Sequence, residues 1–416
     1  MSTTTTPEEL VSRLFERLDE LAAEALRLAI ETCEQRGIAL YLVGGAVRDL
    51  MLGRGHIDLD LAMEAETAPV ADELARRTHA RLVTHERFGT ATVHTREWNI
   101  DLARTRSETY TKPGALPDVE PAALIDDLKR RDFSINAMAL RLSPTPELVD
   151  PFGGAADVEA RSLRVLHEAS FRDDATRLLR GMRYAARLNF KFEPETQAWL
   201  ERDRFYVESI SAARLRRELI LIFEEPTAAR ACLLADEAGV LGAVHPALKM
   251  DEDLAVGWAD ALLGQHHSPL DELGFCLAAT PNSGAAVDLL SSRLHLAGRL
   301  ENALRDFVRL RGQFDTLASL RRKPFEAVEL LEGKSHAAIW ALSIADTRSG
   351  GQTCAQYLEE WRRIRPRLNG NDLQELGVKR GVEVGNTLRM LRRARLEGRA
   401  QTREDEIALV REALQR

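Results

Sequence analysis

The chain has 416 residues, more than a single hydrophobic core ordinarily holds, so we expect several packed units of about 100–150 residues each. Charged residues make up 29% and aromatic residues 6% of the chain, a composition that favours helices over sheets. The formal net charge of −8, taken alone, argues against a nucleic-acid partner, because phosphate binding usually requires a basic surface.

The apolar runs and the cysteines indicate the setting in which the chain works. No apolar run approaches the roughly 20 residues that span a bilayer, which excludes a membrane-spanning protein. The four cysteines lie far apart, without the paired spacing of a zinc site, and nothing resembles a secretory leader. We therefore expect a soluble protein in a reducing cytoplasm, with no membrane partner.

The first 150 residues predict a helix followed by a small mixed α/β domain. A Thr-rich tail over residues 1–7 precedes apolar residues at helical spacing over residues 8–37, and Gly37 closes that helix. The domain is expected to end near Asp150. Strand-like runs lie at residues 39–43, 57–62, 80–84, 90–94 and 99–103, with short helical patterns at 45–52 and 70–78.

Helical patterns dominate from residue 157 onward, so the rest of the chain is predicted to be all-α. The clearest patterns cover residues 174–188, 194–203, 212–223 and 227–239. The stretch 107–128 differs from both halves, because it contains Lys112-Pro113-Gly114 and two further prolines and lacks periodicity. It is predicted to be a long loop.

A basic segment interrupts the acidic chain near its C-terminal end. Residues 361–400 contain eleven Lys and Arg against four Asp and Glu, a net charge of +7. This distribution weakens the argument from total charge and leaves a nucleic-acid partner open.

A glycine pair, Gly44-Gly45, follows the first apolar strand and precedes a helical pattern. Such a turn offers bare backbone N–H groups and a helix N-terminus to phosphate oxygens, and Arg48 adds a cation one turn into the helix. An ordinary strand-to-helix turn has the same pattern. The turn alone does not decide between these readings.

Two carboxylates, Asp58 and Asp60, lie in an otherwise apolar strand, where the period of two places both on one face. Side by side they repel, so the arrangement is costly without a cation. A pair of Mg²⁺ ions would neutralise them, activate an attacking hydroxyl and stabilise a leaving phosphate in a two-metal phosphoryl transfer. A third carboxylate is plausible at Asp101 in a later strand. Solvated strand edges also carry such acids.

The run Arg130-Arg131-Asp132-Phe133, followed by Asn136, joins two cations, an acid and an amide to an apolar stretch. It suits binding of a triphosphate or a ribose. It equally suits a basic cap on a helix, and the residues alone do not decide.

Asp174 and Arg177 open a predicted long helix, three residues apart and therefore on neighbouring positions. A carboxylate accepts and a guanidinium donates, so the pair complements the amino group and ring nitrogen on the edges of cytosine and adenine. Uracil and guanine show the reverse polarity and would leave polar groups unpaired. The alternative is a simple ion pair at a helix start. Arg180 continues the series toward a triphosphate, whereas Arg183 should point away from Asp174 on a straight helix.

In this order and spacing, these motifs together resemble the bacterial-type (class II) CCA-adding enzyme and poly(A) polymerase family. The similarity covers roughly residues 39–192, and a weaker similarity from residue 368 to 398 matches the family's tRNA-binding tail. Asp173 departs from the family pattern, which has Glu there, and its shorter side chain leaves a supporting role open.

The resemblance implies an α+β fold, with a nucleotidyltransferase (polymerase β-like) mixed α/β head followed by all-α neck, body and tail domains that clamp the tRNA acceptor arm. The expected parts are an N-terminal tail and helix (1–37), head (38–150), neck (151–225), body (226–330) and tail (331–416). The expected catalytic residues are Asp58, Asp60 and Asp101, with Mg²⁺ held by Asp58 and Asp60. The expected nucleotide-binding residues are Gly44, Gly45, Arg48, Arg131, Asn136, Asp174, Arg177, Arg180 and Arg183.

The implied reaction is addition of C and A to the 3′ end of tRNA from CTP and ATP, with release of pyrophosphate. The loop around Lys112-Pro113-Gly114 is a candidate element that reshapes the pocket between C and A addition, or a passive surface loop. The alternatives are an enzyme that adds only A or only CC, a poly(A) polymerase, or a catalytically silent RNA-binding protein. The family's phosphohydrolase extension needs a His-Asp dipeptide, which does not occur, so no hydrolase domain is expected and His266-His267 is taken as an exposed loop feature.

Overall fold

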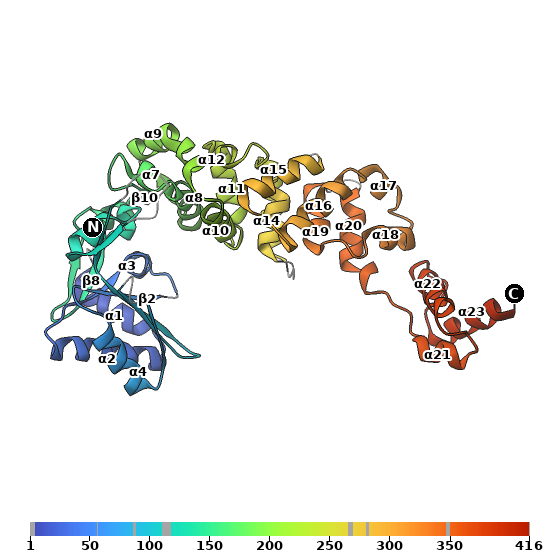
Figure 1. The fold of residues 1–416 in the computed structure, drawn as a ribbon, viewed down its shortest axis with the longest axis horizontal. Helices are drawn as coiled ribbons and strands as arrows, with labels where there is room; N and C mark the ends of the chain where they lie inside the picture. The colour runs from blue at the N-terminus through green and yellow to red at the C-terminus, as the bar shows by residue number, and fades with distance from the viewer. Residues whose placement is uncertain are drawn as a thin grey trace. The chain divides into compact units, whose positions relative to one another are not determined.

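The computed structural model describes residues 5–55, 57–85, 89–109, 118–264, 269–279, 283–346 and 350–415. The chain divides into two compact units, Met1–Ser211 and Ala212–Arg416 (Figure 1). The first unit contains every strand of the described chain, and the second contains only helices. The predicted α+β class, a mixed head followed by an all-α remainder, is confirmed.

A seven-stranded mixed sheet forms the centre of the first unit, in the order β3-β4-β5-β2-β1-β8-β9. Its strands are β1 (Leu40–Val43), β2 (Leu59–Met63), β3 (Arg81–His85), β4 (Thr90–His94), β5 (Asn99–Arg104), β8 (Ala139–Ser143) and β9 (Glu147–Val149). Only the central β2–β5 pair is parallel; the other neighbours run antiparallel. The first five strands confirm the predicted runs, whereas β8 and β9 were not predicted.

The predicted helix over residues 8–37 is in fact two helices, α1 (Pro7–Arg17) and α2 (Glu20–Gln35). Leu18 adopts an extended conformation that ends α1, and the Asp19 side chain accepts a hydrogen bond from the Ala22 backbone at 2.8 Å. An N-cap of this kind starts a new helix. The apolar spacing runs on across the break, which is why the pattern alone concealed it.

Two helices between the strands match the sequence prediction, namely α3 (Gly45–Met51) and α4 (Ala68–Thr78). Helix α4 packs on α2 and on β3 and β4. A buried cluster that includes Tyr41, Val43 and Ala62 joins β1 and β2 to Leu124 and Leu128. This packing fixes β1, which ends at the glycine turn, and β2, whose beginning carries Asp58 and Asp60.

The predicted long loop over residues 107–128 is wrong for the part that the structure describes. A two-stranded antiparallel ribbon, β6 (Arg106–Thr109) with β7 (Asp118–Pro121), leads into helix α5 (Leu124–Lys129). The ribbon is tied down by polar contacts: Thr105 donates to the Ala122 carbonyl at 2.7 Å. Lys112-Pro113-Gly114 lies outside the described residues.

Helices complete the first unit. They are η2 (Ser134–Asn136), α6 (Gly154–Glu159), α7 (Ser170–Asp173), α8 (Thr176–Leu188), α9 (Pro194–Asp203) and η3 (Arg204–Ser209), with a short parallel pair β10 (Ser162–Leu163) and β11 (Lys191–Phe192). The predicted helix start at residue 174 is two residues early, because Asp174 is extended, with φ −140° and ψ 97°. Its carboxylate accepts from the Thr176 N–H at 3.1 Å and so stands before α8.

The second unit is helical throughout its described residues, and none of the described helices is long and apolar enough to cross a bilayer. Phe223, Trp258 and Phe275 pack together in its core. Its helices are α10 (Ala212–Phe223), α11 (Ala228–Glu237), α12 (Val240–Val244), α13 (Glu252–Leu262), α14 (Leu270–Ala278), α15 (Gly284–Leu294), α16 (Arg299–Arg311), α17 (Phe314–Ser319), α18 (Pro324–Leu331), α19 (His336–Ala345), α20 (Gly350–Glu359), η4 (Trp361–Arg363), α21 (Gly370–Glu375), α22 (Val382–Leu396) and α23 (Arg403–Gln415).

The four cysteines are all free thiols and all buried. Cys33 lies in the first unit, and Cys232, Cys276 and Cys354 lie in the second. Burial raises the thiol pKa of Cys33 to about 11 and that of Cys354 to about 12. These side chains therefore stay protonated in the folded chain.

Candidate active site

The turn between β1 and α3 requires glycine at its first position. Gly44 has φ 72° and ψ −132°, and its N–H donates to the Met138 carbonyl at 3.0 Å. A side chain here would collide with the Arg131 guanidinium. The absence of a side chain at Gly44 thus lets a cation from a distant segment lie directly against the turn.

The carboxylates lie where the sheet meets this turn. Asp58 directly precedes β2 and Asp60 lies within it; both are exposed and the intervening Leu59 is buried, which confirms that they share one face. Asp101 of β5 is the register partner of Asp60, and it accepts a hydrogen bond from Thr92 at 2.5 Å. The structure therefore brings the third carboxylate beside the pair.

Asp60 shows the electrostatic cost of this grouping. Its surface remains open to solvent, but surrounding protein atoms desolvate the carboxyl and raise its pKa to about 6, with Asp101 and Asp58 adding to the rise and Arg131 opposing it. Adding a cation would relieve this repulsion. The grouping therefore concentrates negative charge at Asp60.

The donor set fits a metal ion that shares its ligands with substrate. Among the described residues, no group of three or more His, Cys, Asp or Glu is arranged so that these side chains by themselves could hold a metal ion. Mg²⁺ typically takes one or two carboxylates from the protein and completes its shell with water and substrate phosphates. Asp58 and Asp60 match that pattern.

Asn136 connects the cations of the turn to those of α8. Its Oδ1 accepts from Arg48, and its amide nitrogen donates to Asp132 at 2.9 Å. Asp132 in turn binds Arg180 at 2.7 Å. Burial would raise the pKa of Asp132, but Arg180 and Asn136 outweigh it and hold that pKa below its ordinary value.

Arg130 and Arg131 are anchored by one buried acid, Asp127 of α5, at 2.7 and 3.0 Å. Arg130 is the C-cap residue of α5, so the run does sit at a helix end. Both guanidiniums nevertheless line the same cavity as Asp58 and Asp60. The run thus lies at a helix end and at the cavity, and its binding of a triphosphate or a ribose stays a prediction.

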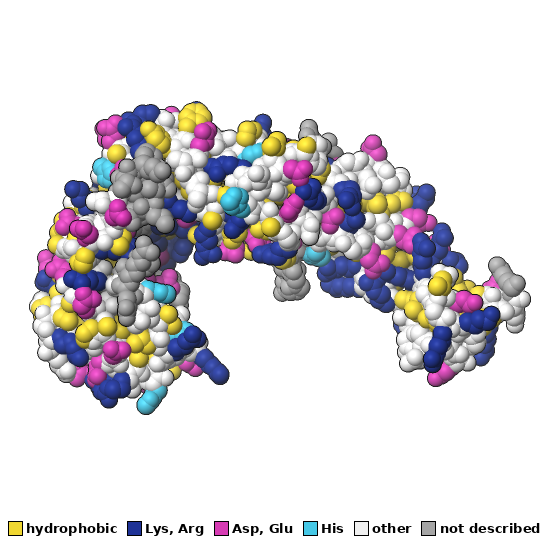
Figure 2. Space-filling view, in the orientation of Figure 1, with side chains coloured by type: hydrophobic (Ala, Val, Ile, Leu, Met, Phe, Trp, Pro, Cys, Tyr) yellow, Lys and Arg dark blue, Asp and Glu magenta, His cyan; other side chains and the backbone are white. Residues whose placement is uncertain are grey.

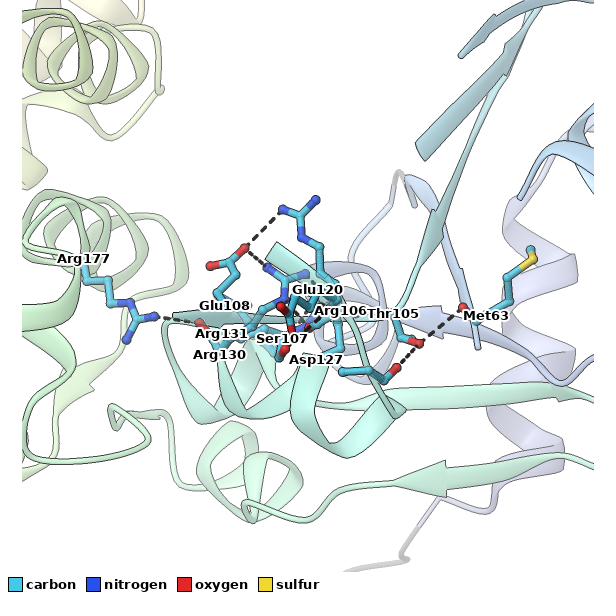
Figure 3. Close-up of polar contacts among 12 residues, drawn as sticks. Met63, Thr105, Arg106, Ser107, Glu108, Glu120, Asp127, Arg130, Arg131 and Arg177 are labelled. Atoms are coloured by element: carbon cyan, nitrogen blue, oxygen red, sulfur yellow. Dashed lines mark hydrogen bonds and ion pairs between the residues drawn. The ribbon is translucent and has the colours of Figure 1, made fainter. Parts of the chain in front are cut away.

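Arg177 is buried and held by backbone carbonyls. It donates to the Arg130 carbonyl at 2.7 Å and to the Ser170 carbonyl at 3.4 Å, as Figure 3 shows for the first of these. Glu108 of β6 lines the same cavity as Arg177 and pairs with Arg130 at 2.7 Å and with Arg106 at 3.2 Å. The ribbon β6–β7 is thereby tied to the segment that fixes Arg177.

One cavity of about 450 Å³ collects most of the predicted set. Arg183 lines it together with Asp174, although an argument from a straight helix directs Arg183 away from Asp174. Gly44 and Asp101 are not among its lining residues. The predicted residues that do line it are Gly45, Arg48, Asp58, Asp60, Arg131, Asn136, Asp174, Arg177, Arg180 and Arg183.

Several lining residues were not predicted. Asp49, Tyr184 and Arg187 each lie next to or one turn from a predicted residue, so helical spacing could have suggested them. Glu108 carries no such signal, because it reaches the cavity only through the ribbon β6–β7.

Two protein families match this chain. The family described as Poly A polymerase head domain matches residues 40–164, which contain the sheet and its carboxylates. The family described as probable RNA and SrmB-binding site of polymerase A matches residues 189–251.

Curated relatives extend the likeness over the whole chain. The chain is similar to the A-adding tRNA nucleotidyltransferases of Halalkalibacterium halodurans (30% identity, 96% of this chain, 92% of the relative) and Geobacter sulfurreducens (30%, 96% of this chain). It spans only 48% of the length of the Geobacter relative. It is also 37% identical to the CC-adding tRNA nucleotidyltransferase of Deinococcus radiodurans, over 64% of this chain and 71% of that one.

Solved structures share the fold. A CCA-adding enzyme in an apo form aligns with a TM-score of 0.81 and 27% identity, over 97% of this chain and 98% of that one. The Thermotoga maritima CCA-adding enzyme complexed with tRNA aligns with a TM-score of 0.76 and 25% identity, over 97% and 98%. With near-complete coverage of a 30% identical relative, this chain belongs to the family of tRNA nucleotidyltransferases that includes the CCA-adding enzymes.

Proposed function

We propose that this chain adds C and A nucleotides from CTP and ATP to the 3′ end of tRNA and releases pyrophosphate. The observation that carries the proposal is a single cavity that unites the carboxylates Asp58 and Asp60 with the pair Asp174 and Arg177. The first pair suits phosphoryl transfer and the second suits base selection. The names of the relatives, all of which transfer nucleotides to tRNA, support the same activity.

Base selection follows from the fixed geometry of the second pair. Arg177 donates two hydrogen bonds to backbone carbonyls, and these hold the guanidinium plane in place. The Asp174 carboxylate accepts two hydrogen bonds from Thr176, one from the backbone N–H and one from the hydroxyl. A preset acceptor and donor match cytosine and adenine and leave uracil and guanine with unpaired polar groups.

Transfer requires the triphosphate and the tRNA 3′ hydroxyl to be held in line. Arg48, Arg131, Arg180 and Arg183 surround the space next to the carboxylates and suit phosphate oxygens. Mg²⁺ bound by Asp58 and Asp60 would supply charge neutralisation at the reacting phosphate and a more acidic 3′ hydroxyl. The chain itself contributes orientation and fixed charge, which supply most of the rate gain in phosphoryl transfer.

The tRNA partner is assigned to the helical remainder of the chain. We assign base recognition to the neck (151–225) and contacts with the acceptor arm to the body and the tail (331–416). A solved relative complexed with tRNA aligns over 97% of this chain, which supports this division.

The extent of addition separates two versions of the proposal. The pair Asp174 and Arg177 accepts both bases and favours complete CCA addition. The relatives that align over 96% of the chain are named A-adding, which favours addition of the terminal A alone.

A product assay tests both versions. Transcripts ending at the discriminator base, at C and at CC are incubated with CTP and ATP, singly and together, and the products are sequenced. Complete addition extends all three transcripts to CCA, whereas an A-adding enzyme extends only the one ending in CC. Failure to incorporate either nucleotide into any transcript would reject the transferase assignment in favour of a silent RNA-binding protein.

A further inference from the structure

Tyr184 lies beneath the cluster of cations in the cavity. It belongs to α8, its ring is buried, and the ring packs edge-on against Phe133 at 5.9 Å with an interplanar angle of 89°. The wall of the cavity includes this ring. No motif singled it out, and none of the steps described above uses it.

Three guanidiniums face the ring of Tyr184. The guanidinium carbons of Arg48, Arg180 and Arg183 lie 5.5, 5.6 and 5.5 Å from its centroid. All are within the range at which the negative face of an aromatic ring attracts a cation. Arg48 comes from α3 and the other two from α8, so the ring joins the turn to the helix.

The three cations differ in their other contacts. Arg48 pairs with Asp49 at 2.8 Å and Arg180 with Asp132 at 2.7 Å. The Nε of Arg183 is buried without a hydrogen-bond partner among the described residues, and the contact that the structure shows for this guanidinium is the Tyr184 face. A ring attracts a cation without neutralising it, so Arg183 retains its charge and its donors for an anion.

The hydroxyl of Tyr184 has a smaller part. It accepts a hydrogen bond from Arg180 at 3.0 Å. Burial, with Asp132 adding to it, raises the phenol pKa, so the group stays neutral and cannot neutralise the arginines. The aromatic face is therefore the feature shared by all three contacts.

We propose that Tyr184 is a positioning residue whose ring holds Arg48, Arg180 and Arg183 together, still charged, for the polyphosphate part of the nucleotide. The proposal rests on the proposed function, in which these arginines bind the triphosphate. The three positive charges repel one another, and attraction to the ring offsets that repulsion. A further carboxylate in place of the ring would also offset it, but would compete with phosphate for the arginines. Tyr184 acts through the arginines and not on the reacting atoms.

The first experiment compares Tyr184→Leu with Tyr184→Phe, which keeps the ring and removes the hydroxyl. Tyr184→Leu is expected to raise the KM for ATP about tenfold with kcat within about twofold, whereas Tyr184→Phe stays within about twofold of wild type in both. Tyr206→Leu, the same change at a half-exposed tyrosine of η3 away from the cavity, is the matched control. It should leave both constants unchanged.

The second experiment removes catalysis from the test. Binding of inorganic tripolyphosphate is measured by calorimetry, and Tyr184→Leu should weaken it by the same factor as the KM. If the wild-type chain incorporates no nucleotide, the proposed function fails, yet the tripolyphosphate comparison still decides the role of the ring. Tyr184→Met, an unbranched replacement that fills space, takes the place of Tyr184→Leu if thermal unfolding shows that the latter does not fold.

Three results would overturn the proposal. One is unchanged ATP KM and tripolyphosphate affinity in the folded variant without a ring. Another is a Tyr184→Phe variant as impaired as Tyr184→Leu, since the hydroxyl would then carry the effect. The last is a fall in kcat with the KM unchanged, which indicates a role in packing alone.

Discussion

Arginines are concentrated in two regions of the molecule, the cavity of the first unit and the segment 361–400 of the second, and they are held in different ways. Arg48 is 4% exposed and its partners are an acid, an amide and an aromatic ring. Arg389 and Arg393 of α22 are 63% and 48% exposed and pair with Glu329 and Glu326. The cavity arginines are fixed, whereas those of α22 can exchange their partners.

The acidic partners in the second unit come from one short helix. Glu326 and Glu329 lie in α18, and Glu332 follows it and pairs with Arg392 at 2.6 Å. Figure 2 shows basic and acidic side chains interspersed around α18. The net charge of +7 along residues 361–400 therefore does not produce an uninterrupted basic surface, because carboxylates distant in sequence cover part of it.

The largest expected effect separates chemistry in the cavity from binding elsewhere. Asp58→Ala should lower nucleotide transfer by at least about a thousandfold, since both carboxylates would be needed to bind the Mg²⁺ that neutralises charge at the reacting phosphate. Binding of tRNA, measured by filter retention, should stay within about twofold. Retained incorporation in this variant would remove Asp58 from the mechanism.

Stability provides the second contrast. Asp132→Ala leaves Arg180 and Asn136 without their buried acceptor and should cost about 3–5 kcal/mol in the free energy of unfolding, measured with urea. Glu326→Ala breaks an exposed pair with Arg393 and should cost less than about 1 kcal/mol. Equal losses would show that burial does not distinguish the two regions.

The contribution of the Asp132–Arg180 pair to stability should depend on pH in a defined direction. The folded pKa of Asp132 lies below its ordinary value of 3.8, so its contribution to stability is complete above that pH and is lost as the pH falls through the folded pKa. The stability difference between wild type and Asp132→Ala should therefore be constant near neutrality and shrink only in acid.

Base selection should change by a smaller factor. Asp174→Ala and Arg177→Ala are each expected to relax discrimination against UTP and GTP by about a hundredfold, because the unpaired groups that reject these bases are removed. The ratio of kcat/KM values for ATP and UTP measures this. Tyr206→Leu, outside the cavity, should leave the ratio unchanged. Undiminished discrimination in both variants would exclude the pair as the base reader.

The smallest effect concerns the arginines of α22. The double variant Arg389→Ala and Arg393→Ala should weaken tRNA binding about fivefold and lower its salt dependence by roughly one to two phosphate contacts, with the ATP KM unchanged. Glu326→Gln combined with Glu329→Gln releases the same arginines and should strengthen binding at low salt. If both double variants changed tRNA affinity in the same direction, the α22 arginines would not exchange their carboxylate partners for tRNA phosphates.

What the sequence could predict depended on regular packing. Asp58 and Asp60 were placed on one face because the alternation around Leu59 reflects a real sheet. The ribbon β6–β7 left no such pattern, since it is short and polar and is held by side chains from other segments. Glu108 could not be assigned to the cavity for that reason.

The boundaries of helices were harder to predict than their existence. The break at Leu18 depends on Asp19, whose side chain caps α2 while the apolar spacing continues. The late start of α8 depends on the extended backbone of Asp174. That Arg183 lines the same cavity as Asp174 also needed the structure, because a straight-helix argument ignores the reach of a long side chain.

The four buried thiols make the unfolding of each unit open to chemical detection. A protonated thiol reacts slowly with alkylating agents, and burial also blocks access to it, so the folded chain should resist iodoacetamide. Cys33 reports on the core of the first unit, and Cys232, Cys276 and Cys354 report on the second. Pulse alkylation along a urea gradient, read by mass spectrometry, would show whether the two units open together or one after the other.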